Sequence, residues 1–215
     1  YLDLADNNIN NASVISHLIN LRYLNLGNNN ISNTSFLEQL INITDLNLKS
    51  NSIRSTDYFQ NLRKLETLNL SDNSVKNINA LQFCRALKRL DLSYNKIVDL
   101  VPLAKLNRLE EINLNKNKIE DLSPLSNLLP KKLLLEDNLI KVGVNTLFAI
   151  ITSDPLPRLA AVQNQASINP NLKASIDLRL NRTINCNDID QLRNRLVNYH
   201  HISISRPSTC INTKH

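Results

Sequence analysis

The hydrophobic positions of the first six units of this chain, up to Ile119, recur every 22 residues, and a seventh unit follows after 21. In the segment 109–119, LEEINLNKNKI, aliphatic residues occupy the first, fourth, sixth and eleventh positions. The fourth and sixth positions are two residues apart, so their side chains point to one face of a predicted strand. One such strand in every unit predicts a solenoid whose stacked strands form a parallel sheet.

Each repeat also places an Asn among its aliphatic positions, at the ninth position of the same pattern. These residues are Asn7, Asn29, Asn51, Asn73, Asn95, Asn117 and Asn138. The chain has to turn sharply after each strand, and such a turn buries backbone N–H and C=O groups that need partners. An Asn side chain offers both a donor and an acceptor. We therefore predict stacked amides, here called the Asn ladder, that satisfy each turn and bridge neighbouring units.

The second half of each unit continues the apolar pattern at a spacing of three residues. Leu100, Leu103 and Leu106 show this spacing in one unit. It suits a short 3-10 or irregular helical arc. Pro102 fits such an arc better than the interior of a long α-helix.

The repeating pattern L-x-x-L-x-L-x-x-N-x-I resembles the leucine-rich repeat family. The resemblance runs from the first residue to about Ile140. The unit length is similar to the class that includes bacterial internalins and the regulatory subunit of protein phosphatase 1. The resemblance implies an α/β fold: a right-handed solenoid with a curved parallel sheet on the concave side and short 3-10 or α-helices on the convex side. Residues 1–140 are accordingly assigned to regular leucine-rich repeats.

Residues 141–215 are predicted to hold irregular longer repeats and a C-terminal cap of the same continuous solenoid. The segment 142–153, VGVNTLFAIITS, has a helical pattern, and a longer unit with a true helix resembles the ribonuclease-inhibitor class. Further elements are predicted at 156–164 (a loosely matching unit with a strand), 176–178 and 202–204 (strands) and 188–199 (a helix). At the other end the chain starts inside a repeat, so we expect an N-terminal cap that the printed residues lack.

The exposed positions that flank the two core positions of each strand are predicted to form a partner-binding concave face. The candidate residues are Tyr23, Asn25, Asp45, Asn47, Asn69, Arg89, Asp91, Tyr94, Glu111, Asn113, Lys132, Leu134 and Glu136. The column that contains the Asn and Asp residues turns apolar at Leu134 and Ala160, with Val162 close by. This change predicts an apolar patch that serves as an interface or lies beneath the C-terminal tail.

Charges alternate in sign along two columns of this face. The columns are Glu66, Lys88, Glu110 and Lys131, and Arg89, Glu111 and Lys132. Such charges either pair with one another across the strands or offer a mixed-charge surface to a polar partner. The sequence leaves both interpretations open.

Composition narrows the function further. The chain carries a net charge of +6, and residues 171–215 hold seven Lys or Arg against three Asp or Glu. This excess keeps one end soluble or favours an acidic partner, but its arginines lack the interleaved aromatics of a nucleic-acid site. No apolar run approaches the roughly 18 residues of a membrane helix, so membrane insertion is not expected.

No motif for catalysis, phosphate binding or metal binding stands out, so we expect no enzyme activity, cofactor or metal. Cys84 occupies a position that other units fill with Leu, which predicts a buried small apolar residue. Cys186 and Cys210 leave a disulfide open, but the odd cysteine count favours free thiols in a reducing compartment. This favours a cytoplasmic location, including a host cytosol after secretion, with surface display as the alternative.

The sequence therefore predicts a non-enzymatic, monomeric module that binds another protein through its concave face. The Asn-, Ile- and Lys-rich, Gly-poor composition suits an AT-rich genome, which suggests a pathogen effector or surface protein that acts on a host protein. Two alternatives remain: an intracellular eukaryotic scaffold similar to the phosphatase regulator, and a substrate-recognition domain of a larger enzyme.

Overall fold

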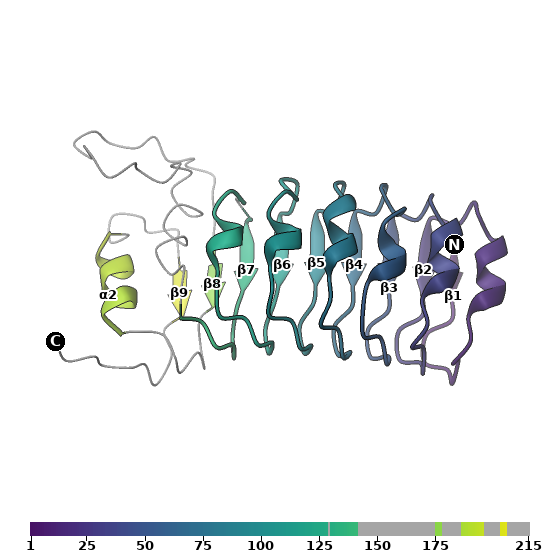
Figure 1. Cartoon of the computed structure of the whole chain (residues 1–215), viewed down its shortest axis with the longest axis horizontal. Helices are drawn as coiled ribbons and strands as arrows, with labels where there is room; N and C mark the ends of the chain where they lie inside the picture. The colour runs from purple at the N-terminus through teal and green to yellow at the C-terminus, as the bar shows by residue number, and fades with distance from the viewer. Residues whose placement is uncertain (129, 142–174, 178–185, 196–202, 206–215) are drawn as a thin grey trace.

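The computed structural model describes residues 1–128, 130–141, 175–177, 186–195 and 203–205. In these residues nine parallel strands form one open sheet, in which each strand pairs with the next along the chain (Figure 1). The strands are β1 (Leu2–Asp3), β2 (Tyr23–Asn25), β3 (Asp45–Asn47), β4 (Thr67–Asn69), β5 (Arg89–Asp91), β6 (Glu111–Asn113), β7 (Lys132–Leu134), β8 (Ser175–Asp177) and β9 (Ser203–Ser205).

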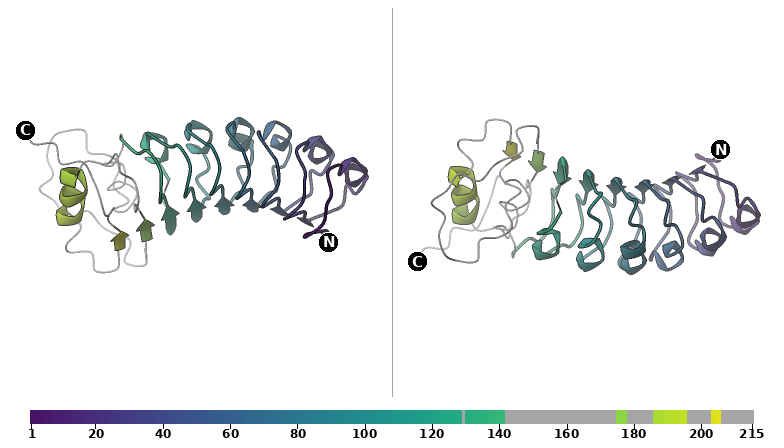
Figure 2. Two further views of the ribbon diagram at one scale, coloured as in Figure 1. Left: turned by 90° about the horizontal axis from the view of Figure 1, so that it is seen from below. Right: turned by 90° about the horizontal axis from the view of Figure 1, so that it is seen from above.

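Short 3-10 helices form a second layer on the convex side of this sheet (Figure 2). They are η1 (Ser13–His17), η2 (Ser35–Gln39), η3 (Asp57–Phe59), η4 (Asn79–Phe83), η5 (Val101–Leu103) and η6 (Ser123–Leu125). Pro102 lies in η5, at the start of a short arc where its missing N–H costs little. The fold predicted from the repeat is confirmed: a curved leucine-rich repeat solenoid with a parallel sheet on the concave side.

The repeat sets the register of the sheet. Leu46, Leu68 and Leu90 are paired in register, and each is at most 3% exposed. Their positions alternate with outward-facing residues because successive strand side chains point to opposite faces. The aliphatic residues from the sheet and from the helical layer form one continuous core between the two layers.

The Asn ladder links each unit to the one before it. Asn95 donates from Nδ2 to the carbonyl oxygens of Leu70 at 2.9 Å, Leu92 at 3.1 Å and Ser93 at 3.1 Å. Its Oδ1 accepts the backbone N–H of Val75 at 2.8 Å. Two of these four partners belong to the preceding unit, so one side chain closes its own turn and joins two units.

The same arrangement recurs along the ladder. The backbone N–H groups of Ile9, Ile31, Ile53, Val75, Ile97 and Ile119 donate in turn to Oδ1 of Asn29, Asn51, Asn73, Asn95, Asn117 and Asn138. Asn7, in the first unit, is exposed and donates only to the carbonyl oxygens of Leu4 and Ala5. Among the described residues, every buried side-chain nitrogen and oxygen has a hydrogen-bond partner.

The residue before each ladder Asn has a left-handed backbone conformation that bends the chain away from the strand. These residues are Asp6, Asn28, Ser50, Asp72, Tyr94, Lys116 and Asp137, with φ between 51° and 57°. Asp and Asn tolerate this conformation because their short side chains bond locally to the backbone. Tyr94 and Lys116 lack that compensation, so these two turns are locally strained.

The C-terminal elements differ in part from the sequence prediction. β8 pairs directly with β7, with Ile176 in register with Leu133. No further strand of the sheet therefore lies between β7 and β8. The unit predicted at 156–164 itself lies outside the described residues, so its strand remains a prediction.

The other C-terminal predictions have mixed outcomes. The predicted final strand corresponds to β9, and the predicted helix corresponds to α2 (Cys186–Arg195), which begins two residues earlier than expected. The predicted helix at 142–153, and with it the resemblance to ribonuclease-inhibitor units, lies outside the described residues. The boundary at residue 140 remains a prediction.

Replacement of Asn95 by Leu tests the ladder. Leu has a similar volume but leaves the Val75 N–H and several carbonyl groups unpaired in the core, at about 1–3 kcal/mol for each group. We expect Asn95→Leu to lower the free energy of unfolding, measured by urea denaturation, by about 3 kcal/mol or more. Asn7→Leu is the matched control and should cost less than about 1 kcal/mol, since Asn7 is exposed and bridges to no earlier unit. Equal losses in the two variants would contradict the account.

Cys84 supplies a second test, of the core. Its side chain is fully buried and its Sγ donates to the carbonyl oxygen of Phe59 at 3.4 Å. Burial raises the pKa of the Cys84 thiol to about 12. In a Cys186→Ser/Cys210→Ser variant at pH 8, we expect a thiol reagent to label native protein at least about 100 times more slowly than urea-unfolded protein. Rapid labelling of the native state would show that the core is open here.

Candidate partner-binding site

Two rows of side chains cross the strands on the concave face. The first row comes from the first residue of each strand and contains Tyr23, Asp45, Thr67, Arg89, Glu111 and Lys132. The second row comes from the third residue and contains Asn25, Asn47, Asn69, Asp91, Asn113 and Leu134. Backbone pairing places the members of each row in register, one strand apart. The spacing along a row is therefore about 4.8 Å.

A hollow of about 210 Å³ lies on this face over β4 to β7. Seven candidate residues line it: Asn69, Arg89, Asp91, Glu111, Asn113, Lys132 and Leu134. Thr67 also lines the hollow, although it was not among the candidates; its place in the first row would have identified it. Tyr23, Asn25, Asp45 and Asn47 lie on β2 and β3, outside the lining.

The second row also shapes the turns, a role that the sequence analysis missed. Oδ1 of Asn69 accepts the N–H of Ser71 at 2.9 Å, and Oδ1 of Asp91 accepts that of Ser93 at 2.9 Å. These Asx turns begin the bend after each strand. Oδ2 of Asp91 accepts Nδ2 of Asn113 at 3.1 Å. Part of the hydrogen-bonding capacity of this row is therefore used by the fold.

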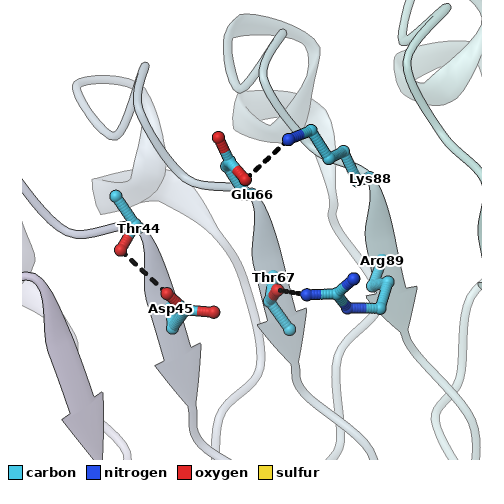
Figure 3. A network of polar contacts seen from close by, with 6 residues as sticks. All are labelled: Thr44, Asp45, Glu66, Thr67, Lys88 and Arg89. Carbon is cyan, nitrogen blue, oxygen red and sulfur yellow. Dashed lines mark hydrogen bonds and ion pairs between the residues drawn. The ribbon is translucent and has the colours of Figure 1, made fainter.

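The two charged columns behave differently. In the column just before the strands, Lys88 pairs with Glu66 at 2.8 Å and Lys131 pairs with Glu110 at 2.7 Å. Figure 3 shows the first of these pairs, together with the hydrogen bond of 3.1 Å from Arg89 to the hydroxyl of Thr67. These side chains satisfy one another at the upper border of the face.

The first row is not neutralised in this way. Arg89, Glu111 and Lys132 are exposed, and within the described part of the chain they form no ion pair. Of the two interpretations left open by the sequence, self-pairing holds for the flanking column and not for the first row. Three charges of alternating sign therefore face the solvent across the hollow.

Both candidate tyrosines lie away from the hollow. Tyr23 stacks on Tyr1, with ring centroids 4.2 Å apart, and its pKa is raised first by hydrogen bonding with Tyr1 and then by burial. Tyr94 lies on the turn after β5, where the Lys116 ammonium is 4.7 Å from its ring centroid. Tyr94, predicted to lie on the concave face, thus follows its strand and does not line the hollow. Glu136 also follows its strand, β7, and does not line the hollow.

The predicted apolar extension of the face remains a prediction. In the sheet, Leu134 is in backbone register with Asp177 of β8. Ala160 and Val162, the other members of the predicted patch, lie outside the described residues.

The described residues contain no cluster of three or more His, Cys, Asp or Glu side chains that could hold a metal ion. Within the same residues, no helix has both the length and the apolar character needed to cross a bilayer.

The stacked strands, the 3-10 arcs and the Asn ladder define a leucine-rich repeat solenoid, and comparison with known families agrees. The profile described as "Leucine rich repeat" matches residues 41–97, "Leucine Rich repeats (2 copies)" matches 85–127, and "Leucine Rich Repeat" matches 20–40. The chain belongs to the leucine-rich repeat family. A search of curated proteins found no match.

Among solved structures, the chain is similar to two internalins of Listeria monocytogenes. Internalin C2 superposes with a TM-score of 0.76 and 24% identity, covering 96% of this chain and 79% of that one. A second internalin (inlF) superposes with a TM-score of 0.65 and 26% identity, covering 98% of this chain and 68% of that one. The solenoid is therefore internalin-like in fold, which is the architecture of a protein-interaction module.

The Lys131–Glu110 pair predicts a specific titration. The hydrogen bond and charge of Lys131 are the main causes that lower the pKa of the Glu110 carboxyl. A lowered pKa adds stability above the unfolded-state pKa, and that stability is lost as pH falls through the folded-state pKa. Lys131→Gln should raise the Glu110 pKa measured by NMR, whereas Lys132→Gln should leave it nearly unchanged. If the Glu110 pKa changed only in the Lys132→Gln variant, the ion pair of Glu110 would be assigned to the wrong lysine.

Proposed function

We propose that this chain is a non-enzymatic module that binds another protein through the hollow over β4 to β7. The observation that carries the proposal is the set of unpaired charges on Arg89, Glu111 and Lys132, above a rigid sheet. The neighbouring Glu66–Lys88 and Glu110–Lys131 pairs show that charges on adjacent strands can satisfy one another in this fold. Charges left open beside them are available to a partner.

The order of these charges describes the partner. A segment that lies across the strands meets a positive, a negative and a positive charge at intervals of about 4.8 Å. Its complement carries acidic, basic and acidic groups in that order. Asn69, which lines the hollow, adds an amide Nδ2 donor that bonds to no other described residue. Electrostatic complementarity of this kind favours fast and selective association.

We further propose that the protein acts as a monomer on a host protein, as a bacterial effector or surface protein. The internalin-like fold and the AT-rich composition support this assignment. No cofactor is required for this function, because binding uses the side chains of the concave face alone.

The experiment compares three forms of the protein as bait in lysate from candidate host cells. Arg89→Glu/Lys132→Glu reverses two charges of the hollow. Lys96→Glu/Lys118→Glu makes the same charge change on the loops that follow β5 and β6. A partner captured by the wild type is then titrated against all three proteins by calorimetry. We expect the first variant to weaken binding at least about tenfold, equivalent to 1.4 kcal/mol, and the second to bind like the wild type.

Compensation makes the test sharper. If the charges act as described, the partner's acidic groups can be changed to Lys to restore complementarity. This partner variant should bind the Arg89→Glu/Lys132→Glu protein more tightly than the unmodified partner binds it. Binding that is unaffected by the hollow variant, or lost equally in both variants, would place the interface elsewhere.

A further inference from the structure

One edge of the solenoid carries five basic side chains and no acidic one in three consecutive units. This edge is formed by the loops that join a 3-10 helix to the next strand, at residues 60–64, 82–86 and 104–108 (Figure 1). Its basic residues, here called the basic edge, are Arg63, Lys64, Arg85, Lys105 and Arg108. All five side chains are exposed.

The loops of this edge stack in register, which brings the charges together. Nζ of Lys64 donates to Oδ1 of Asn42 at 2.8 Å, and Nδ2 of Asn42 donates to the carbonyl oxygen of Ile19 at 3.0 Å. These bonds join the loops of consecutive units, and Lys64 and Asn42 hold equivalent positions 22 residues apart. Arg63 and Arg85 therefore hold equivalent positions in adjacent units, and the loops that carry them contain no acidic residue. These like charges repel one another unless an anion is present.

The protein does not supply that anion from the described residues. Glu66 and Glu110 immediately precede the adjoining strands β4 and β6, but they pair with Lys88 and Lys131. No member of the basic edge forms an ion pair in the described part of the chain. The opposite edge is different, because its loops at 49–57, 71–79, 93–101 and 115–121 mix six basic with five acidic residues. Uncompensated positive charge is therefore particular to one edge.

Exposed apolar side chains lie on the same edge. Ile19 is 54% exposed, Ile41 is 51% exposed and Phe83 is 45% exposed. Ile19 and Ile41 hold the position that Arg63 and Arg85 occupy in the next units, since each is 22 residues from the next. The edge thus presents exposed apolar side chains next to basic groups; Glu38, at the start of the loop that carries Ile41, is its one acidic residue in these five units.

We propose that this edge docks on the surface of an anionic lipid bilayer. The basic side chains would meet lipid phosphates, while Ile19, Ile41 and Phe83 enter the interfacial region. A bilayer accepts protruding apolar tips and requires no matching concavity, whereas an acidic protein would match the charges and leave the apolar tips unexplained. Docking at this edge leaves the concave face open and does not rest on the function proposed for it.

The experiment measures co-sedimentation of the whole chain with vesicles of phosphatidylcholine containing about 30% phosphatidylglycerol. A basic residue at an anionic surface contributes roughly a fivefold increase in partitioning. Arg63→Gln/Arg85→Gln/Arg108→Gln should therefore weaken partitioning about 100-fold. The control Arg54→Gln/Lys76→Gln/Lys96→Gln removes the same charge from the opposite edge and should partition like the wild type. Circular dichroism establishes that each variant is folded.

A variant with unchanged net charge distinguishes binding to a lipid bilayer from binding to other anionic partners. Ile41→Asn/Phe83→Asn should weaken partitioning at least about fivefold through loss of interfacial burial, and wild-type binding should weaken as salt rises. Equal binding to vesicles of phosphatidylcholine alone, or equal losses in the two arginine and lysine variants, would overturn the proposal. The proposal would also be overturned if Ile41→Asn/Phe83→Asn still bound the vesicles and soluble polyglutamate displaced the wild-type protein from them. That result would assign the edge to an acidic protein.

Discussion

The amide of the repeating Asn is the interaction on which the solenoid depends. From Asn29 onward, each ladder amide accepts a backbone N–H from the preceding unit and donates to backbone carbonyls of both units, as Asn95 does with Val75 and Leu70. The turn after a strand therefore has its buried polar groups satisfied only when two units are stacked. Stability arises from such nearest-neighbour contacts, as in other repeat proteins, and the spacing of the concave face follows from them.

This arrangement separates the scaffold from the surfaces it presents. The core positions and the Asn ladder determine the strand, the turn and the helical arc of each unit. The first residue of each strand can therefore vary in charge with little cost in folding stability. Thr67, Arg89 and Glu111 occupy equivalent positions in consecutive units and differ completely in chemistry. The loops on the edges have the same freedom. Two distinct surfaces, the hollow and the basic edge, can therefore be carried by one regular framework.

Much of the fold could be predicted because the regular repeat determines which residues of neighbouring strands pair. Once Leu46 and Leu68 occupy equivalent positions, their pairing follows from stacking. The β7–β8 contact could not be predicted in this way, because the intervening residues break the period. The left-handed backbone of Tyr94 could not be predicted from its residue type, because a bulky side chain disfavours it; its position directly before a ladder Asn imposes it.

The candidate site was predictable as a surface but not as a set of interactions. The sequence placed alternating charges in two columns, yet side-chain direction decides that Glu110 reaches Lys131 while Glu111 and Lys132 stay open. The Asx turns of Asn69 and Asp91 depend on contacts two residues away that a search for binding groups overlooks. The basic edge was present in the sequence, but its members are separated along the chain and only stacking makes them neighbours.

Amide hydrogen exchange of the N–H groups that donate to the ladder tests the central claim most directly. Ile53, Val75 and Ile97 donate to Oδ1 of the next Asn at 2.8–2.9 Å, although they lie outside the strands. We predict protection factors comparable to those of Leu48, Leu70 and Leu92, whose N–H groups continue the sheet pairing by donating to backbone carbonyls of the next unit. Exchange at the rate of an unstructured peptide, while the sheet amides stay protected, would show that the side-chain amides do not hold the units together.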